Sequence, residues 1–401
     1  MKHIVIVIKQ INNRSGGAER LYCDLANKLL KLGFKVSCLV YESSKPKPFY
    51  RIDKEVDIIN LYVPAQNRKL ITRICSKLKN RYLPSIIKNL AQYISENLDF
   101  ITQLRVFCKN NNVGASISFM PPANTINVIS TLGLKTNSII TNHNVPQEDY
   151  ENPKRWGKNP VDIFLRKKTA IKADFIHVLF EEFGNWFPID VQSKIRVIHN
   201  FVPGEFFDHT PDFEKREKMI IAVGRLAPVK NYGTLIEAWA LINKEFPAWK
   251  IEIYGVGQDK KLLRGLINTN GLNNSVFLKG HTKNINKHYE RSRLMVHPAA
   301  HEGFGLSVAE ALAKKVPVIA FQDCHGVNQF VYDKINGLMV DRGTSEINSL
   351  AAALKTYLNS PSLQTELFSN SQASISEFNE RKYLHKWKSL ISEVTFANEG
   401  E

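Results

Sequence analysis

The chain has 401 residues, too many for one ordinary hydrophobic core and enough for two domains of about 150–200 residues each. It has no uncharged apolar run of about 18 residues, which argues against a membrane-spanning helix, and its five cysteines have no metal-ligand spacing, which predicts reduced thiols in a cytosol. Most of the net charge of +16 lies in the first 205 residues, where 30 Lys+Arg stand against 17 Asp+Glu. This asymmetry favours an anionic partner, although a uniformly basic proteome would also explain it.

The first half alternates short apolar runs with helical patterns. Residues 3–8 are apolar and mostly β-branched, which predicts a first strand rather than a signal peptide. A helical pattern over 18–32 ends at Gly33, and a strand is expected at 36–40. Further strands are predicted at 115–119, 138–141, 175–179 and 195–198. Such alternation predicts a parallel sheet with helices on both faces.

The pattern restarts after a polar segment, 210–218, which reads as a linker. The strands expected there are 219–223, 250–254, 276–278, 294–297, 317–321 and 337–340, and the helices are 232–246, 260–268 and 306–314. We therefore predict an α/β protein with two Rossmann-like, doubly wound domains facing across a cleft. Their bounds are 1–205 and 206–378, and a last helix at about 379–395 is expected to pack back on the first domain.

The densest functional signal is the run from His301 to Leu312, which places Glu302 in a glycine-rich loop and Glu310 inside the following helix. The two carboxylates do not oppose each other as they do in hydrolases. The helix entrance instead offers backbone amides suited to a phosphate. A helix entrance with ordinary surface acids is the alternative interpretation.

A second cluster lies on the loop after strand 219–223, where Arg225 and Lys230 follow Gly224. Two cations on a strand-to-helix loop can converge on a pyrophosphate, and arginine can bind it in a bidentate manner. The loop is at the carboxyl side of its strand, where doubly wound sheets bind ligands. Two solvated surface cations would give the same pattern.

Three motifs in this order resemble those of the retaining glycosyltransferase family 4: Gly16-Gly17-Ala18-Glu19-Arg20, Gly224-Arg225 with Lys230-Asn231, and Glu302 with Glu310. The resemblance covers essentially the whole chain and is most specific in the second half. It implies the GT-B architecture, with an acceptor-binding first domain and a donor-binding second domain. It also implies a nucleotide-sugar donor, retention at the anomeric carbon and no requirement for a metal or another cofactor.

The resemblance also implies roles for single residues. Arg225 and Lys230 hold the donor pyrophosphate and stabilise the leaving nucleoside diphosphate. Glu310 binds the ribose hydroxyls, and Glu302 contacts hydroxyls of the donor sugar. Phe304, Gly305 and Leu306 give backbone amides to the phosphates, and Gly280, His281 and Thr282 belong to a loop that recognises the base. Gly16 and Gly17 form a flexible loop of the first domain that reaches towards the phosphates or the incoming acceptor, and an ordinary strand–helix turn is the alternative.

His143 follows a predicted strand of the first domain and matches the family's histidine near the donor sugar, where it positions the transferred sugar. A histidine satisfied within its own loop is the alternative. The loops 254–258 and 280–283 are expected to recognise the base. The chain departs from the family at Gly255-Val256-Gly257-Gln258, at Gly326-Val327-Asn328-Gln329 and at Phe180, which weakens the assignment of a donor.

The stretch between Asp57 and Glu96 contains no acid and seven cations: Arg68, Lys69, Arg73, Lys77, Lys79, Arg81 and Lys88. Apolar residues recur there with helical spacing, and Pro84 divides two predicted helices. Residues 68–94 therefore read either as basic amphipathic helices on an anionic membrane or as helices packed on their own domain with a basic side to solvent.

The sequence thus predicts a hexosyltransferase that uses a nucleotide sugar, a uridine diphosphate sugar on family frequency. The expected acceptor is a glycolipid or lipid-linked oligosaccharide of bacterial surface polysaccharide or lipopolysaccharide assembly, and the expected location is cytoplasmic, peripheral on the inner face of the cell membrane. A nucleotide-sugar epimerase of similar fold and a non-catalytic sugar-binding subunit are the alternatives. No G-x-G-x-x-G follows the first strand, which argues against a dehydrogenase, and no zinc-finger or RNP-type signature points to nucleic acid.

Overall fold

The computed structural model describes residues 2–12, 14, 16–153, 155–208 and 210–396. The chain divides into two compact units, one of Met1–Ile198 with Leu384–Glu401 and one of His199–Tyr383. The second unit is therefore inserted into the sequence of the first. Residues 199–205, which the sequence pattern placed in the first domain, lie in the second unit.

A sheet of seven strands, each parallel to its neighbours, forms the centre of the first unit in the order β3-β2-β1-β4-β5-β6-β7. Its strands are β1 (His3–Val7), β2 (Lys35–Val40), β3 (Asp57–Asn60), β4 (Val113–Phe119), β5 (Asn137–Asn142), β6 (Phe175–Val178) and β7 (Ile195–Val197). The central strands are buried on both faces, which explains their continuous apolar sequences. β3 was not predicted, because this edge strand is short and half-exposed and lacks such a run.

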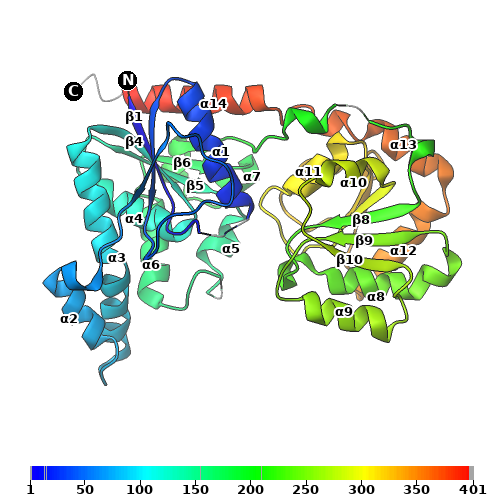
Figure 1. The fold of residues 1–401 in the computed structure, drawn as a ribbon, viewed down its shortest axis with the longest axis horizontal. Helices are drawn as coiled ribbons and strands as arrows, with labels where there is room; N and C mark the ends of the chain where they lie inside the picture. Colours follow the sequence, from blue (N-terminus) through cyan, green and yellow to red (C-terminus); the bar gives the residue numbers. More distant parts are fainter. Residues whose placement is uncertain (1, 13, 15, 154, 209, 397–401) are drawn as a thin grey trace. The chain divides into compact units, whose positions relative to one another are not determined.

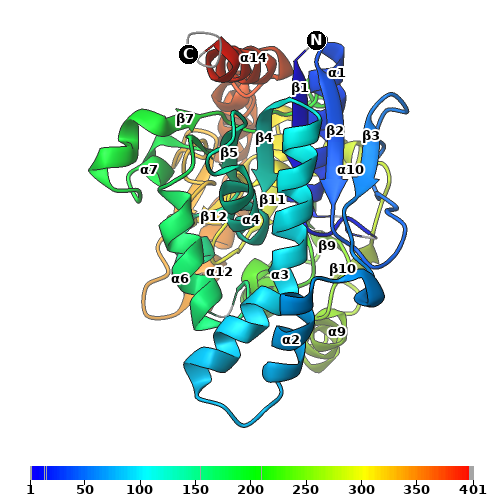
Figure 2. The same ribbon diagram turned by 90° about the vertical axis from the view of Figure 1, so that its left-hand side faces the viewer.

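Helices cover both faces of this sheet. Their bounds are α1 (Gly17–Lys31), α2 (Leu70–Leu78), α3 (Ser85–Asn110), α4 (Pro121–Thr131), α5 (Pro146–Tyr150), α6 (Pro160–Ala170) and α7 (Glu181–Gly184). α3, α4 and α6 pack side by side on one face, and α1 lies on the other (Figure 2). The predicted α/β fold with a parallel sheet is confirmed for this unit.

The second unit has a parallel six-stranded sheet in the order β10-β9-β8-β11-β12-β13 (Figure 1). Its strands are β8 (Met219–Val223), β9 (Lys250–Tyr254), β10 (Val276–Gly280), β11 (Leu294–His297), β12 (Val318–Phe321) and β13 (Gly337–Val340). The flanking helices are α8 (Tyr232–Ile242), α9 (Lys260–Thr269), α10 (Ile285–Arg291), α11 (Leu306–Ala313), α12 (Glu346–Leu358) and α13 (Pro361–Asn370). β8, β9, β11 and β13 have the predicted bounds.

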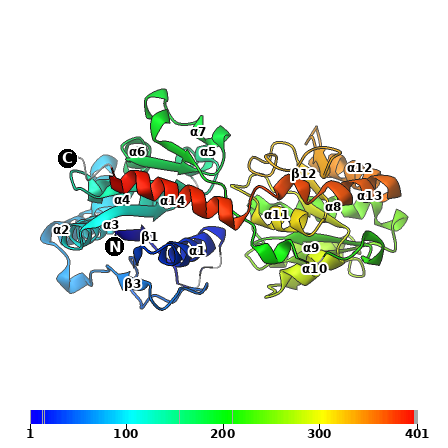
Figure 3. The same cartoon turned by 90° about the horizontal axis from the view of Figure 1, so that it is seen from above.

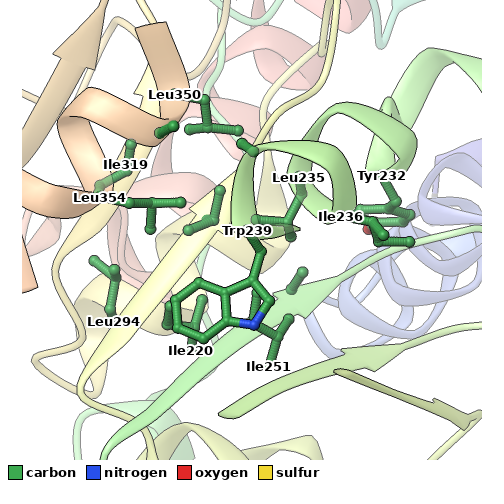
Figure 4. Close-up of a cluster of buried hydrophobic side chains, with 14 of the residues drawn as sticks. Ile220, Tyr232, Leu235, Ile236, Trp239, Ile251, Leu294, Ile319, Leu350 and Leu354 are labelled. Atoms are coloured by element: carbon green, nitrogen blue, oxygen red, sulfur yellow. The ribbon is translucent and has the colours of Figure 1, made fainter. Parts of the chain in front are cut away.

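The core of the second unit is built around the fully buried Trp239 on α8, which packs among aliphatic side chains of the sheet and of α12 (Figure 4). The segment 210–218 belongs to this unit and is not a linker. Arg216 is buried there and donates hydrogen bonds to the main-chain carbonyls of Ser292 at 2.8 Å and Lys314 at 2.6 Å.

The last helix, α14 (Glu380–Phe396), passes from the second unit into the first at Leu384 (Figure 3). Within the first unit it packs against β5, β6 and β7. Trp387 is buried with its ring 5.2 Å from that of His177, Glu393 pairs with Arg196, and the Val394 carbonyl accepts from the Asn137 amide at 3.0 Å. These contacts make α14 part of the first unit's core.

Each sheet reverses its strand order once. In the first sheet the reversal lies between β1 and β4, and in the second it lies between β8 and β11. Because the crossovers on either side of such a point leave in opposite directions, a crevice opens beside the carboxyl ends of those two strands. These two edges are where ligand sites are expected.

As predicted, Pro84 lies between the two helices α2 and α3, and it immediately precedes α3. Proline fits the start of a helix because the first N–H groups have no acceptor within the helix. Across the part of the chain that the structure describes, no helix is both long and apolar enough to span a membrane.

Candidate active site

The reversal point of the second sheet brings together several predicted donor residues. The loop after β8 carries Gly224, Arg225 and Lys230, and the chain after β11 leads to Glu302. The predicted base loops follow β9 and β10 at the same edge, because parallel strands end on one side of a sheet. The donor residues predicted for the second domain thus share one unit.

Backbone contacts hold the loops after β8 and β9 close together. The Gly224 amide donates to the Tyr254 carbonyl at 3.0 Å, and the Leu226 amide donates to the Val256 carbonyl at 3.0 Å. Gly255 has φ +151°, and a Cβ there would lie 1.8 Å from the Gly224 carbonyl oxygen. Glycine is therefore required at Gly255, one of the positions where the chain departs from the family pattern.

Lys230 and Glu302 form an ion pair between the ammonium and one carboxylate oxygen. The side chains are 15% and 24% exposed, so the pair is shielded but reachable. Burial would raise the pKa of the Glu302 carboxyl, yet the Lys230 ammonium and the His297 ring outweigh this effect and lower it well below its usual range. Glu302 is therefore a carboxylate that balances Lys230 at neutral pH.

His297 is the last residue of β11. Its Nε2 lies 3.5 Å from the Glu302 carboxylate of this pair. Burial and the neighbouring Lys230 ammonium lower the pKa of His297, so the ring is neutral near pH 7. The sequence interpretation missed it. The available signal was its position at the carboxyl end of a predicted strand, just before the His301–Leu312 run.

The backbone around Asn231 fixes where Lys230 points. Asn231 is left-handed with φ 52°, a conformation that asparagine tolerates. The side-chain amide N–H of Asn231 donates to the Glu346 carboxylate at 2.9 Å, and its side-chain oxygen accepts from the Thr234 hydroxyl at 2.9 Å. Glu346 is held in turn by Arg342 at 2.7 Å.

Arg225 is exposed, and among the described residues no ion pair or hydrogen bond to its side chain is found. The structure therefore places Arg225 on the same loop as Lys230 but does not bring it into the Lys230–Glu302 pair. Arg225 is available to an incoming anion.

α11 begins at Leu306, immediately after the predicted phosphate-binding residues. Gly305 caps it with φ +80°, and a Cβ there would lie 2.9 Å from a methyl carbon of Val327. The first N–H groups of a helix have no acceptor within the helix and attract anions. Glu310 lies one turn inside, buried, with its carboxylate 3.5 Å from the Tyr289 hydroxyl.

Gly280 is the last residue of β10 and the first of the predicted base loop. Its carbonyl accepts from the Gly255 amide at 2.8 Å. The Thr282 hydroxyl accepts from the Asn284 amide at 3.2 Å, so this loop is folded on itself. His281 lies between them. The two predicted base loops are thus neighbours at the sheet edge.

The remaining predicted residues lie in the first unit. Gly16 and Gly17 open α1, with Gly16 as its N-cap. His143 follows β5 and stacks on Phe119, with ring centroids 4.7 Å apart. Both ring nitrogens of His143 are buried without a hydrogen-bond partner among the described residues. Burial and the neighbouring His177 hold the pKa of His143 well below its ordinary value, so it is neutral.

Among the residues that the structure describes, no group of three or more His, Cys, Asp or Glu side chains is arranged to hold a metal ion. Arg225 and Lys230, on the loop after β8, contribute positive charge at this edge of the second sheet. The arrangement can accept a diphosphate and bind hydroxyl groups through two carboxylates.

Comparison with known proteins gives related sequences over the full chain. An uncharacterized glycosyltransferase of Haemophilus influenzae is 26% identical over 98% of this chain and 100% of its own length. The Campylobacter jejuni enzyme named GalNAc-alpha-(1->4)-GalNAc-alpha-(1->3)-diNAcBac-PP-undecaprenol alpha-1,4-N-acetyl-D-galactosaminyltransferase is 27% identical over 99% of this chain and 100% of its own.

Solved structures share the fold. Sucrose-phosphate synthase of Thermosynechococcus elongatus superimposes with a TM-score of 0.78 at 18% identity over 99% of this chain and 100% of that one. S. aureus TarM in complex with UDP superimposes with a TM-score of 0.72 at 18% identity, over 98% of this chain and 100% of that one. Residues 205–374 match the family model described as glycosyl transferases group 1. Residues of the second unit thus match the family model described as glycosyl transferases group 1, and the chain shares the GT-B fold of these solved structures.

Proposed function

We propose that this glycosyltransferase moves a hexose or N-acetylhexosamine from a uridine diphosphate sugar to a glycolipid or lipid-linked oligosaccharide, with retention at the anomeric carbon. The observation that carries the donor assignment is the Lys230–Glu302 pair at the reversal point of the second sheet, beside the start of α11. A cation, a helix N-terminus and hydroxyl-binding carboxylates are the groups that a sugar diphosphate needs.

Charge stabilisation is the main chemical task of this site. Negative charge grows on the diphosphate as the bond to the sugar breaks, and preorganised cations lower the energy of that state. Lys230 is paired with Glu302, and the neighbouring Asn231 is anchored by its side-chain hydrogen bond to Glu346. Arg225 supplies the second cation from the same loop. Glu302 and Glu310 are proposed to bind hydroxyls of sugar and ribose, and the roles given to His143, Gly16 and Gly17 remain predictions.

The uridine diphosphate assignment is supported by structures of the same fold. Anabaena HepE was solved with UDP and glucose, and pneumococcal GtfA with UDP and GlcNAc. The lipid-linked acceptor is supported by the name of the Campylobacter jejuni relative, which specifies an undecaprenol-linked acceptor.

A surface on α2 and α3 fits a membrane-associated acceptor. We define the basic-apolar surface as the exposed apolar side chains Leu70, Ile71, Ile74, Tyr82, Ile86, Ile87 and Leu90 with the seven cations from Arg68 to Lys88. Leu70 and Ile86 are 70% and 71% exposed. They do not pack on their own domain, which favours the membrane interpretation over the solvated-helix alternative. We propose peripheral binding to the anionic inner face of the cell membrane.

The direct test is donor hydrolysis by the purified full-length chain without acceptor, measured as nucleotide release across uridine, guanosine, adenosine and thymidine diphosphate sugars. We expect slow release from one uridine diphosphate sugar, and its loss in Lys230→Ala. Lys244→Ala is the matched control, because Lys244 is exposed and follows the far end of α8. No release from any donor would refute the donor assignment, and an altered free nucleotide sugar would indicate an epimerase.

A further inference from the structure

Tyr232, the first residue of α8, extends from the core of the second unit to the edge of its sheet. Its ring packs among the buried apolar side chains of that core (Figure 4). Its hydroxyl lies against Gly224, the residue that follows β8. A Cβ at Gly224 would be 2.7 Å from the Tyr232 oxygen and 3.0 Å from Cε of Lys230. The hydroxyl therefore lies beside the Lys230 side chain.

This hydroxyl has no hydrogen-bond partner in the part of the chain that the structure describes, although Tyr232 is only 2% exposed. Buried hydroxyls are almost always bonded, because an unmet one loses its hydration without compensation. A phenylalanine would fill the same apolar space without that cost. The protein thus keeps a hydrogen-bond donor next to Lys230 that the structure does not use.

The nearest candidate acceptor is the Glu302 carboxylate. Burial and the Glu302 charge raise the pKa of Tyr232, so the hydroxyl keeps its proton and can donate. A hydrogen bond to a carboxylate is about twice as strong as one between neutral groups. In this structure Glu302 is instead paired with the Lys230 ammonium, with the His297 ring 3.5 Å away.

A bound diphosphate changes the demand on Lys230. It carries more negative charge than one carboxylate and therefore attracts the ammonium more strongly. An ammonium that is drawn to the diphosphate compensates Glu302 less. Because Glu302 is largely shielded from water, a carboxylate that loses its partner there is costly unless another donor satisfies it.

We infer that Tyr232 is a positioning residue that donates to the Glu302 carboxylate when the donor diphosphate draws Lys230 away. The bond keeps Glu302 in place for the sugar and leaves Lys230 to the leaving group. The inference rests on the proposed glycosyltransferase function and adds a residue to which that function gives no role. Tyr232 stands outside the sequence motifs, two residues after Lys230.

Stability without ligand gives the first test, because a purely structural hydroxyl would be bonded in the free protein. Tyr232→Phe should leave the Tm of the full-length chain unchanged or raise it, since the lost hydroxyl has no partner. Tyr357→Phe is the matched control: Tyr357 is also buried in the second unit, but its hydroxyl donates to the Arg293 carbonyl. Its loss should lower Tm. An equal fall of Tm in Tyr232→Phe would overturn the inference.

Binding to the full-length chain gives the second test, measured by titration calorimetry with UDP and with inorganic pyrophosphate. Tyr232→Phe should weaken both by about tenfold, as for one lost hydrogen bond to a charged group. Tyr357→Phe should bind both as the wild type does. Unchanged affinity in Tyr232→Phe would overturn the inference.

A double-mutant cycle identifies the acceptor. Glu302→Gln removes the charge to which Tyr232 is proposed to donate. In that background Tyr232→Phe should weaken pyrophosphate by less than about threefold, because contacting groups are not additive. An undiminished tenfold loss would place the hydroxyl on another acceptor and contradict the inference.

The two probes separate this inference from the proposed function. If pyrophosphate binds the wild type and UDP does not, the uridine assignment fails and the pyrophosphate series still decides the role of Tyr232. If both probes bind the wild type and Tyr232→Phe equally well, the inference fails alone. Binding of neither probe to the wild type would refute the donor site and the inference together.

Discussion

Lys230 and Arg225 lie on one loop but in different surroundings, and the difference bears on how each can act. Lys230 is largely shielded and already held by a carboxylate, whereas Arg225 is exposed. A restrained cation loses little freedom when an anion arrives. A mobile arginine side chain must be ordered, at a cost of about 2 kcal/mol or less. We therefore propose Lys230 as the preorganised cation and Arg225 as the one that closes on the ligand.

Replacing either cation tests whether both stabilise the diphosphate. We expect Lys230→Ala and Arg225→Ala each to lower kcat/KM by about 10²–10³, the effect of removing one preorganised group that stabilises charge. Steady-state kinetics measure this, with Lys244→Ala as control. A loss below about tenfold in both variants would place the diphosphate elsewhere.

Because two side-chain cations are proposed to neutralise the leaving group, turnover should persist in excess EDTA. The measurement is nucleotide release before and after extensive chelation, followed by addition of manganese or magnesium. Activity that disappears with EDTA and returns with manganese would contradict the assignment of Arg225 and Lys230 as the leaving-group cations.

At the scale of elements, α2 and α3 present an apolar stripe that the sequence alone could not interpret. Helical spacing showed that Leu70, Ile71 and Ile74 share a face, but spacing is the same for a core face and a membrane face. The structure buries Thr72 and Cys75 of α2 instead and leaves the larger apolar side chains exposed. Tertiary packing, which no local pattern encodes, decides which of these side chains are buried.

Charge reversal on α2 and the turn after it tests membrane binding. Each Lys or Arg near an anionic surface contributes about 1 kcal/mol, and salt screens it over about 8–10 Å. The wild type should co-sediment with vesicles rich in anionic lipid and be released by high salt. The triple variant Arg73→Glu, Lys77→Glu, Arg81→Glu should bind weakly and transfer poorly to a lipid-linked acceptor, with donor hydrolysis unchanged.

A matched triple reversal at Lys244, Lys261 and Lys287, which lie in the second unit, controls for net charge. Equal binding of the wild type to neutral and anionic vesicles would return α2 and α3 to the solvated-helix interpretation.

The same limit explains which site residues the sequence could predict. Glu302, Gly305 and Glu310 stand within one short run, so their spacing carried the signal. His297 matters because the fold places it beside Glu302 and Lys230, and Lys230 lies on another loop, far from it in the sequence.

At the scale of the whole molecule, the second unit interrupts the first. The first unit needs the part of α14 from Leu384 onward to complete its packing, since the side chains Trp387, Leu390, Ile391 and Val394 are buried. The chain therefore crosses between the units twice, after Ile198 and after Tyr383.

Truncating Trp387 should accordingly destabilise only the first unit. We expect Trp387→Ala to cost about 3–5 kcal/mol, as for other buried tryptophans, and Lys388→Ala on the exposed side of the same helix to cost little. Hydrogen exchange followed by mass spectrometry would locate the loss. Equal deprotection of β8–β13 in the second unit would contradict this assignment.

The inserted arrangement has a consequence for the order in which the protein matures. Chains emerge from the ribosome amino end first, and domains generally fold as units during synthesis. All residues of the second unit have been made once Tyr383 is added, before α14 exists as a helix. The first unit, although translated first, keeps the apolar surface beside His177 uncovered until the final segment arrives. It is therefore finished last, and a nascent chain stalled before Leu384 exposes a binding surface for chaperones on its amino-terminal half.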